Sequence, residues 1–273
     1  MTPTPHSTPT ATATPTTSTR RAVLRGTAAV TALTAAGLAR PGTAQAAQPV
    51  PAARPGGRSP EIGILLYDGF SMLDPTGPAE VLSRLPGATV TMIAEQRGPV
   101  RTDTGDVAVL ADRSIAEVGR LDVLLVPGGG NRGTVGAMEN QALLAWIRDI
   151  DRHSRWTTSV CTGALILAAA GLLDGRRATT YWASADYLRS TFDVTYVPER
   201  YVRSGKIITA AGVSAGLDMA LYLASKMAGE GTAKAIQLAI EYDPRPPFHS
   251  GNAADADPEL KALALKLLAD SQV

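Results

Sequence analysis

Short apolar runs that alternate with helix-forming segments constrain the fold of this chain more than any other feature of its sequence. Ile62–Tyr67 and Leu121–Val126 are almost wholly apolar, and Ala88–Ala94 and Thr157–Val160 are two further strand-like runs. A strand that is apolar along its length needs cover on both faces, as in a parallel sheet between helices. The alternation therefore predicts an α/β fold with a mainly parallel sheet.

The remaining elements are predicted from periodicity and from local breaks in the pattern. Apolar residues recur at helical spacing most clearly in Asn140–Arg152. We expect two further strands, at Val194–Val197 and Lys206–Ala210. Other helices are predicted after Cys161 and over Pro78–Leu85, Ala185–Phe192, Ser214–Ala228, Thr232–Tyr242 and Pro258–Ala269.

Residues 1–46 have the pattern of an export signal. Residues 1–19 are almost all Thr, Pro, Ala and Ser, and a twin-arginine pattern follows at Thr19–Arg25. The weakly apolar run Thr27–Ala39 is too short to span a bilayer, and Ala44–Ala46 is an A-x-A cleavage site. The alternative is a disordered basic leader. We predict export of the folded protein through the twin-arginine pathway, to the periplasm or the exterior.

The part that remains after residue 46 has the composition of one sizeable domain. It holds 22 basic and 25 acidic residues, which gives no sign of a nucleic-acid partner. No later stretch is long and apolar enough for a membrane span, so we expect no stable membrane insertion after cleavage. We predict a linker at 47–60, an α/β domain at 61–251, and a C-terminal tail at 252–273 that can form a helix.

Three strand ends carry residues that can do chemistry. Asp74 follows the first strand, Gly128–Gly130 follows the third, and Cys161 follows the fourth. In open parallel sheets, ligands bind beyond the carboxyl ends of the strands. The sequence thus predicts a carboxylate, a bare glycine backbone and a thiol on one edge of the sheet.

Cys161 is the only cysteine of the chain, and it stands where a strand turns into a helix. Such a turn exposes a nucleophile, and a helix N-terminus lowers a thiol pKa below its usual value of about 8.5. The alternative is a buried, inert cysteine. An odd free cysteine in an exported protein favours a functional role, in which Gly129 and Gly130 could donate backbone N–H groups to a developing anion.

Two motifs point elsewhere. Gly128, Gly130 and Gly133 match the dinucleotide fingerprint, but the next helix is predicted only near Asn140. Gly212–Gly216 matches the G-x-S-x-G motif of serine hydrolases, but no later strand supplies the acid and histidine. Both interpretations are therefore disfavoured, and Ser214 is expected to be a helix N-cap.

The other candidate residues each have a simpler structural interpretation. Asp74 precedes Pro75 and could be only a turn or capping residue, and Glu80 would favour the dipole of a helix capped at Gly77. His153 has the place of a solvated helix end, and no cluster has metal-ligand spacing.

Several blocks of the sequence resemble the DJ-1/PfpI superfamily, and within it the isonitrile hydratase subgroup. The resemblance covers roughly residues 61–251. It is carried by Leu73–Glu80, Val126–Gly130, Ser159–Ala164 and Ala169–Thr180, and for the subgroup by Gln237–Tyr242 and Pro246–Phe248.

This resemblance implies a flavodoxin-like three-layer sandwich, a homodimer, a small-molecule substrate and no cofactor. Asp74, Cys161 and Thr162 would be the catalytic residues of an isonitrile hydration. In that scheme Cys161 attacks the isonitrile carbon to give a thioimidate, Asp74 protonates the nitrogen side, and Thr162 with the Gly129 and Gly130 amides holds water or charge.

Tyr181 is a departure from the superfamily pattern, because many relatives have histidine there. A Cys–His dyad of that kind is therefore not available, which weakens a protease- or amidase-like interpretation. Glyoxalase- or deglycase-like chemistry, and a redox sensor or binding protein in which Cys161 is oxidised, stay as alternatives.

Overall fold

The computed structural model describes residues 58–273. The predicted signal, residues 1–46, and most of the predicted linker lie outside the described residues. In the described part, no helix is long and apolar enough to cross a bilayer.

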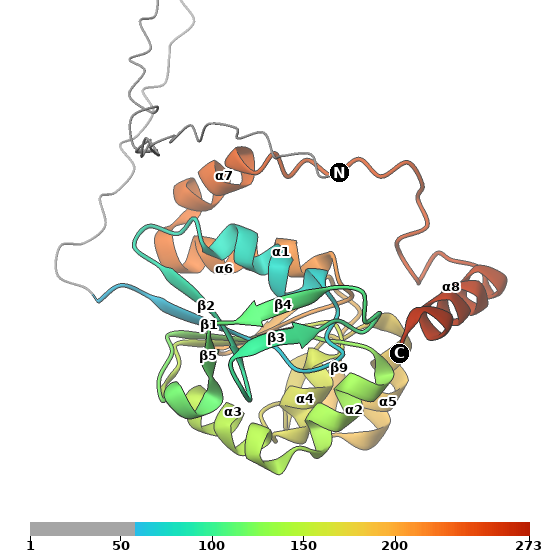
Figure 1. Cartoon of the computed structure of the whole chain (residues 1–273). Coiled ribbons are helices and arrows are strands. Elements are labelled where there is room, and N and C mark those ends of the chain that lie inside the picture. Colours follow the sequence, from blue (N-terminus) through green and yellow to red (C-terminus); the bar gives the residue numbers. More distant parts are fainter. Residues whose placement is uncertain (1–57) are drawn as a thin grey trace, which may run out of the picture. The chain divides into compact units, whose positions relative to one another are not determined.

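A seven-stranded sheet forms the centre of the domain (Figure 1). All neighbouring strands are parallel except the edge pair β10 and β11. In spatial order the strands are β10 (Tyr201–Ser204), β11 (Ile207–Ala210), β7 (Trp156–Val160), β6 (Val123–Val126), β1 (Glu61–Leu65), β2 (Thr89–Ala94) and β5 (Arg113–Ser114).

Helices cover both faces of this sheet. One face carries α1 (Leu73–Leu82), α6 (Ala215–Ala228) and α7 (Glu230–Ala239). The other face carries α2 (Asn131–Glu139), α3 (Gln141–His153), α4 (Gly163–Ala169) and α5 (Ala185–Thr191). The three-layer α/β architecture predicted from the apolar runs is confirmed.

Strand β6 shows why these runs are continuously apolar. Its four residues are all fully buried. Val123 and Leu125 pack in the cluster with α1, α6 and α7, whereas Leu124 and Val126 pack in the cluster with α3 and α4. Alternate side chains thus enter two separate cores, so that no position faces water.

Several short elements had no clear sequence signal. The hairpin of β3 (Gly98–Arg101) and β4 (Ala108–Ala111), the pair β8 (Arg176–Ala178) and β9 (Val194–Tyr196), and edge strand β10 are partly exposed. Of these, only β9 was predicted. Short strands with exposed residues lack the apolar run that marks the central ones.

Two helix starts differ from the prediction. Helix α1 begins at Leu73, not near Pro78, so Asp74 lies in its first turn and Gly77 lies inside the helix. Helix α2 begins at Asn131, directly after Gly130, where no helix was expected before Asn140. Asn140 instead caps α3 by accepting a hydrogen bond from Leu143 N at 3.0 Å.

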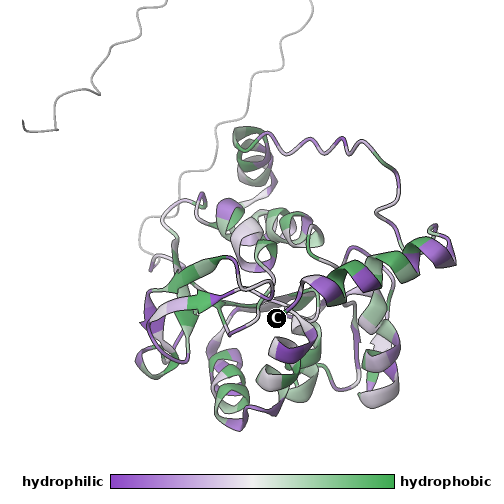
Figure 2. Cartoon of the chain, turned by 45° about the vertical axis from the view of Figure 1, so that its right-hand side comes forward, coloured by the Kyte–Doolittle hydropathy of each residue, from purple (hydrophilic) through white to green (hydrophobic). Residues whose placement is uncertain are grey.

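The C-terminal tail forms a helix, as expected. Helix α8 (Pro258–Ser271) begins at an Asp257 cap, and both apolar and polar residues are distributed along it (Figure 2). None of its residues is buried. Residues 243–257, which precede it, contain no helix or strand and are mostly exposed.

Candidate active site

Cys161 occupies a strained turn between β7 and α4. Its φ is +57°, in the left-handed region that non-glycine residues rarely adopt, at a cost of roughly 1–3 kcal/mol. Its N–H donates to Ala210 O and Ala211 O at 3.1 and 3.0 Å, and its carbonyl accepts from Thr180 Oγ1 at 2.9 Å. These bonds hold the turn in the nucleophile-elbow conformation that the sequence predicted.

Two glycines let the elbow approach the neighbouring strand end. A Cβ at Gly163 would lie 2.2 Å from Val126 O, and a Cβ at Gly128 would lie 2.7 Å from the Cys161 Cβ. Neither position can hold a side chain without displacing backbone. The glycines at these two positions therefore set how closely Cys161 stands to the loop after β6.

Asp74 is fully buried beneath the same loop. Its Oδ2 accepts from Gly128 N at 2.8 Å, whereas its Oδ1 has no hydrogen-bond partner among the described residues. Burial raises the pKa of Asp74 to about 7, the Gly128 amide opposes this shift, and the charge of Asp103 adds to it. The carboxyl group is thus poised to gain or lose a proton near neutral pH.

The thiol of Cys161 is also buried, with 6% of the residue exposed. Burial raises its pKa well above the usual value, and the charge of Asp74 raises it further. The Thr162 and Val213 amides and the Thr162 hydroxyl face the sulfur and lower the pKa, but they do not outweigh burial. The expectation of a thiol pKa lowered by a helix N-terminus was therefore wrong; α4 has only seven residues.

Thr162 connects the elbow to α2. Its Oγ1 accepts from Gly129 N at 2.9 Å and lies 2.9 Å from Thr134 Oγ1. Thr134 in turn lies in the first turn of α2, and its hydroxyl donates to Gly129 O at 3.2 Å. The network fixes the hydroxyl of Thr162 beside the thiol.

The amides of Gly129 and Gly130 were expected to face a developing anion. In the structure the Gly129 amide donates to the Thr162 hydroxyl, and the Gly130 amide donates to Gly69 O at 2.9 Å. Neither donor is free. Of the two, only the Gly129 amide belongs to the hydrogen-bond network at the elbow.

The same loop explains the apparent dinucleotide fingerprint. The helix does start directly after Gly130, so that part of the argument against a cofactor was wrong. However, a Cβ at Gly133 would lie 2.6 Å from Asp68 O, and β7, the next strand, ends without an acid. The glycines allow α2 to pack on the 68–70 turn.

Ser214 is the N-cap residue of α6, as expected, but its side chain makes no capping hydrogen bond. It is exposed, and its Oγ accepts from Arg200 at 3.4 Å. Both described histidines, His153 and His249, are exposed. Residues 58–273 contain no group of His, Cys, Asp and Glu side chains that could hold a metal ion.

Tyr181 and Tyr67 contribute phenol groups near the elbow. Burial raises the pKa of Tyr181, and so does the charge of Cys161. Tyr67 is buried at the end of the first apolar run, and its hydroxyl donates to Pro127 O at 3.1 Å. Tyr67, Thr134 and Val213 were missed at the sequence level, although Tyr67 carried a signal as a polar group at a strand end.

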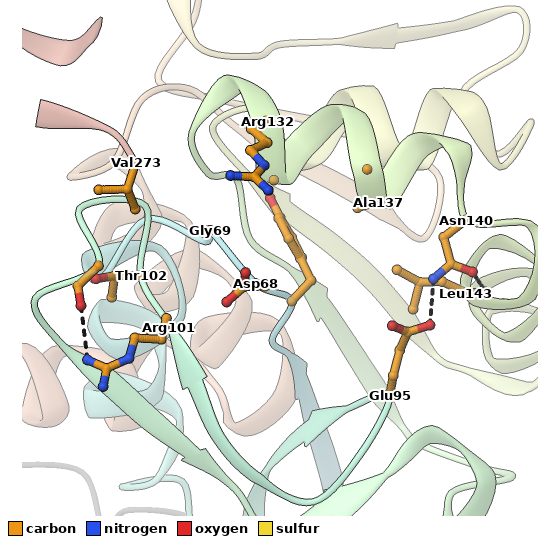
Figure 3. A pocket seen from close by; sticks show the side chains of 14 residues that line it. Asp68, Gly69, Glu95, Arg101, Thr102, Arg132, Ala137, Asn140, Leu143 and Val273 are labelled. Atoms are coloured by element: carbon orange, nitrogen blue, oxygen red, sulfur yellow. Dashed lines mark hydrogen bonds between the residues drawn. The ribbon is translucent and has the colours of Figure 1, made fainter. Parts of the chain in front are cut away.

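Two cavities lie on opposite faces of α2. One has a volume of about 460 Å³ and reaches Gly129 and Thr162. The other, about 440 Å³, is lined by charged side chains that include Asp68, Arg101 and Arg132 (Figure 3). Neither cavity has Asp74 or Cys161 in its lining, but the uncharged one includes Thr162, which follows Cys161 directly in the chain. The uncharged cavity is therefore the one that reaches the elbow.

A parallel sheet between two helical layers, with a buried thiol on an elbow beside a buried carboxyl group, defines a class of flavodoxin-like cysteine proteins. The DJ-1/PfpI family profile matches residues 60–226. The chain belongs to the DJ-1/PfpI family.

Individual relatives of the chain differ in function. Isonitrile hydratase of Pseudomonas putida is 43% identical over 70% of this chain and 82% of its own length. The transcriptional regulator CdhR of Pseudomonas aeruginosa is 29% identical over 67% of this chain, but over only 55% of its own length. A THiJ/PfpI family protein from Pseudomonas syringae superposes with a TM-score of 0.73 at 35% identity, over 78% of this chain and 87% of that one.

Proposed function

We propose that this protein hydrates isonitriles to N-substituted formamides, with Cys161 as nucleophile and Asp74 as the proton-transfer group. One observation carries the proposal: Gly128 packs against Cys161 and its amide donates to the buried Asp74 carboxyl group, so a carboxyl group whose pKa is raised to about 7 lies close to the elbow thiol. The similarity to the Pseudomonas putida hydratase supports it. No described histidine is placed to move the proton instead, since both are exposed.

The first step is addition of the thiol to the isonitrile carbon. The Cys161 proton passes to the free Oδ1 of Asp74 as the sulfur forms its bond to the terminal carbon of R–N≡C. The scheme expected from the sequence has Asp74 protonate the nitrogen side first, but electron balance requires the first proton on carbon. The lone pair left on carbon takes the proton from Asp74, so the first proton goes to carbon and yields the thioimidate R–N=CH–S–Cys161.

The second step is hydrolysis of the thioimidate. Water adds to its carbon, and the nitrogen takes a proton, which gives R–NH–CH(OH)–S–Cys161. Breaking the C–S bond then releases R–NH–CHO and restores the thiol. Asp74 serves first as base toward water and then as acid toward nitrogen. The Thr162 hydroxyl would hold the water, the Gly129 amide would orient that hydroxyl, and Gly130 would support the loop.

The thiol environment argues against a redox sensor. Oxidation follows thiolate character and exposure, whereas Cys161 is buried and burial raises its pKa. A glyoxalase- or deglycase-like reaction would use the same thiol. Tyr181 stands where many relatives have histidine, so a Cys–His dyad at that position is not available to such a reaction. The isonitrile proposal needs only Cys161 and Asp74.

Turnover with chemically defined substrates tests the function. Protein without residues 1–46 is incubated with isonitriles, reactive aldehydes and primary amides, and products are measured by mass spectrometry. We expect stoichiometric N-substituted formamide from isonitriles and none from the Cys161→Ala variant. Formamide production at the wild-type rate by Cys161→Ala, or turnover of aldehydes alone, would refute the proposal.

A further inference from the structure

The cavity that reaches the elbow has an uncharged lining. Its lining is polar at Gly129, Thr134 and Thr162, which belong to the hydrogen-bond network at the elbow, and mostly apolar elsewhere, where Leu165 and Met138 contribute. None of the residues that line it is charged. Its volume of about 460 Å³ is within the ~300–1,000 Å³ range of small-molecule sites.

Helix α8 forms part of the outer wall through Leu265, Leu268 and Ala269. The two residues that follow it attach its C-terminal end to the domain by one side-chain and one backbone hydrogen bond. Gln272 Oε1 accepts from Asn131 N at 3.1 Å, and Val273 N donates to Asp103 O at 3.0 Å. No residue of α8 is buried, so this wall contributes little to the core.

The leucines of α8 divide into two groups. Leu265 and Leu268 line the cavity and are 43% and 40% exposed, whereas Leu267 does not line it and is 60% exposed. When a ligand covers apolar side chains with this exposure, the removal of their surface from water favours binding. A ligand in the cavity would cover Leu265 and Leu268, and this burial would stabilise the complex.

We propose that this cavity binds the substituent of the isonitrile, that the substituent is uncharged and largely apolar, and that α8 selects it through Leu265 and Leu268. This inference rests on the proposed function. The reactive carbon would lie at the polar part of the lining, near Thr162, and the substituent would extend toward α8. A carboxylate on the substituent would lose its hydration without gaining a charged partner.

The test is a series of n-alkyl isonitriles from methyl to hexyl, with a carboxylate-ended analogue. In the wild type kcat/KM rises about fourfold per methylene until the cavity is full, and the carboxylate analogue is the poorest substrate. Leu268→Ser and Leu265→Ser reduce the increase per methylene by half or more. The matched control Leu267→Ser on the same helix keeps the wild-type increase.

A second measurement separates this inference from the proposed function. Alkyl methanethiosulfonates of the same chain lengths label Cys161, and their rates are divided by those with a free thiol. A chain-length preference that Leu268→Ser removes and Leu267→Ser keeps supports the cavity, even if isonitriles are not turned over. Turnover of isonitriles with no chain-length preference, or equal effects of the two serine variants, would overturn the inference and leave the hydratase function standing.

Discussion

At the scale of residues, the proposed chemistry depends on how Asp74 and Cys161 share protons. Burial raises the pKa of both groups, to about 7 for Asp74 and well above the usual value for the thiol. Between these two values the pair carries a single proton. A pair of this kind is one titrating unit, so a thiolate with a neutral acid and a thiol with a carboxylate are equivalent states for kinetics.

The pH profile of kcat/KM should therefore rise through about pH 7 and remain high at pH 9. Below pH 7 the pair gains a second proton, and the thiol loses its base. Asp74→Asn should abolish this rise, lower turnover roughly 10²-fold or more, and leave Cys161 open to alkylation. Stopped-flow or steady-state rates across pH 5–10 check this. Near wild-type turnover by the Asn variant would show that Asp74 only shapes the first turn of α1.

The same carboxyl group should make stability depend on pH. Its folded pKa of about 7 is above the ordinary value of 3.8, so its contribution is fully present below about pH 4 and is lost as pH rises through 7. A shift of about 3 units corresponds to about 4 kcal/mol. The free energy of unfolding of Asp74→Asn minus that of the wild type should therefore be larger at pH 8 than at pH 4, by up to about 4 kcal/mol. The reason is that Asn carries no buried charge at pH 8. Urea unfolding at both pH values measures this difference, and an unchanged difference would contradict the burial argument.

At the scale of elements, the elbow requires α4 to start against the end of β6. The Val126 carbonyl occupies the space where a Gly163 side chain would lie. The loop after β6 then places Gly128 N on Asp74 and Gly129 N on Thr162. One backbone segment thus positions both the carboxyl group and the hydroxyl beside the thiol.

Replacing Gly163 by Ala should separate the elbow from this loop. Because the added Cβ would meet backbone at 2.2 Å, we expect a loss of about 1–3 kcal/mol and a change in the alkylation rate of Cys161. Gly136→Ala in α2 is the matched control, because a Cβ there meets nothing within 4 Å. It should be neutral or stabilising by up to about 1 kcal/mol. Equal thermal unfolding midpoints for the two variants would contradict the close approach.

At the scale of the whole molecule, two expectations extend beyond the single described domain. One concerns residues 1–46, whose twin-arginine pattern predicts export. The other concerns association, since α8 exposes Leu260 and Leu263 at 36% and 51%. Two such leucines one turn apart on a helix without buried residues favour contact with another surface.

Export should depend on the two adjacent arginines. Replacing Arg20 and Arg21 by Lys should hold the precursor inside the cell, because the twin-arginine pathway recognises that pair. Fractionation with antibody detection measures the distribution, and a variant of the outlying Arg40→Lys is the control. Secretion of the double variant at the wild-type level would refute the signal.

The protein without residues 1–46 should form a homodimer at micromolar concentration. Light scattering measures its mass, and Leu263→Asp should shift it toward the monomer if α8 takes part. A wild-type mass equal to that of one chain would contradict the expectation.

The sequence by itself determined the fold class and most of the central elements. Continuously apolar strands such as Val123–Val126 reveal a two-sided sheet because every residue must enter one of two cores. It also indicated that Asp74 and Cys161 belong to the same edge, since both follow parallel strands. Short, partly exposed strands such as Gly98–Arg101 gave no comparable pattern.

Only the tertiary structure decided the protonation of the site. A local pattern places Cys161 before a helix and so predicts a low thiol pKa, but the burial that outweighs this effect comes from a core cluster whose residues are distant in sequence, such as Ile62 and Met219. The pairing of the Gly130 amide with Gly69 O also joins segments about sixty residues apart. The wall that α8 adds to the cavity joins the chain end to α2. Burial and cavity shape depend on contacts between distant segments, and no local periodicity encodes them.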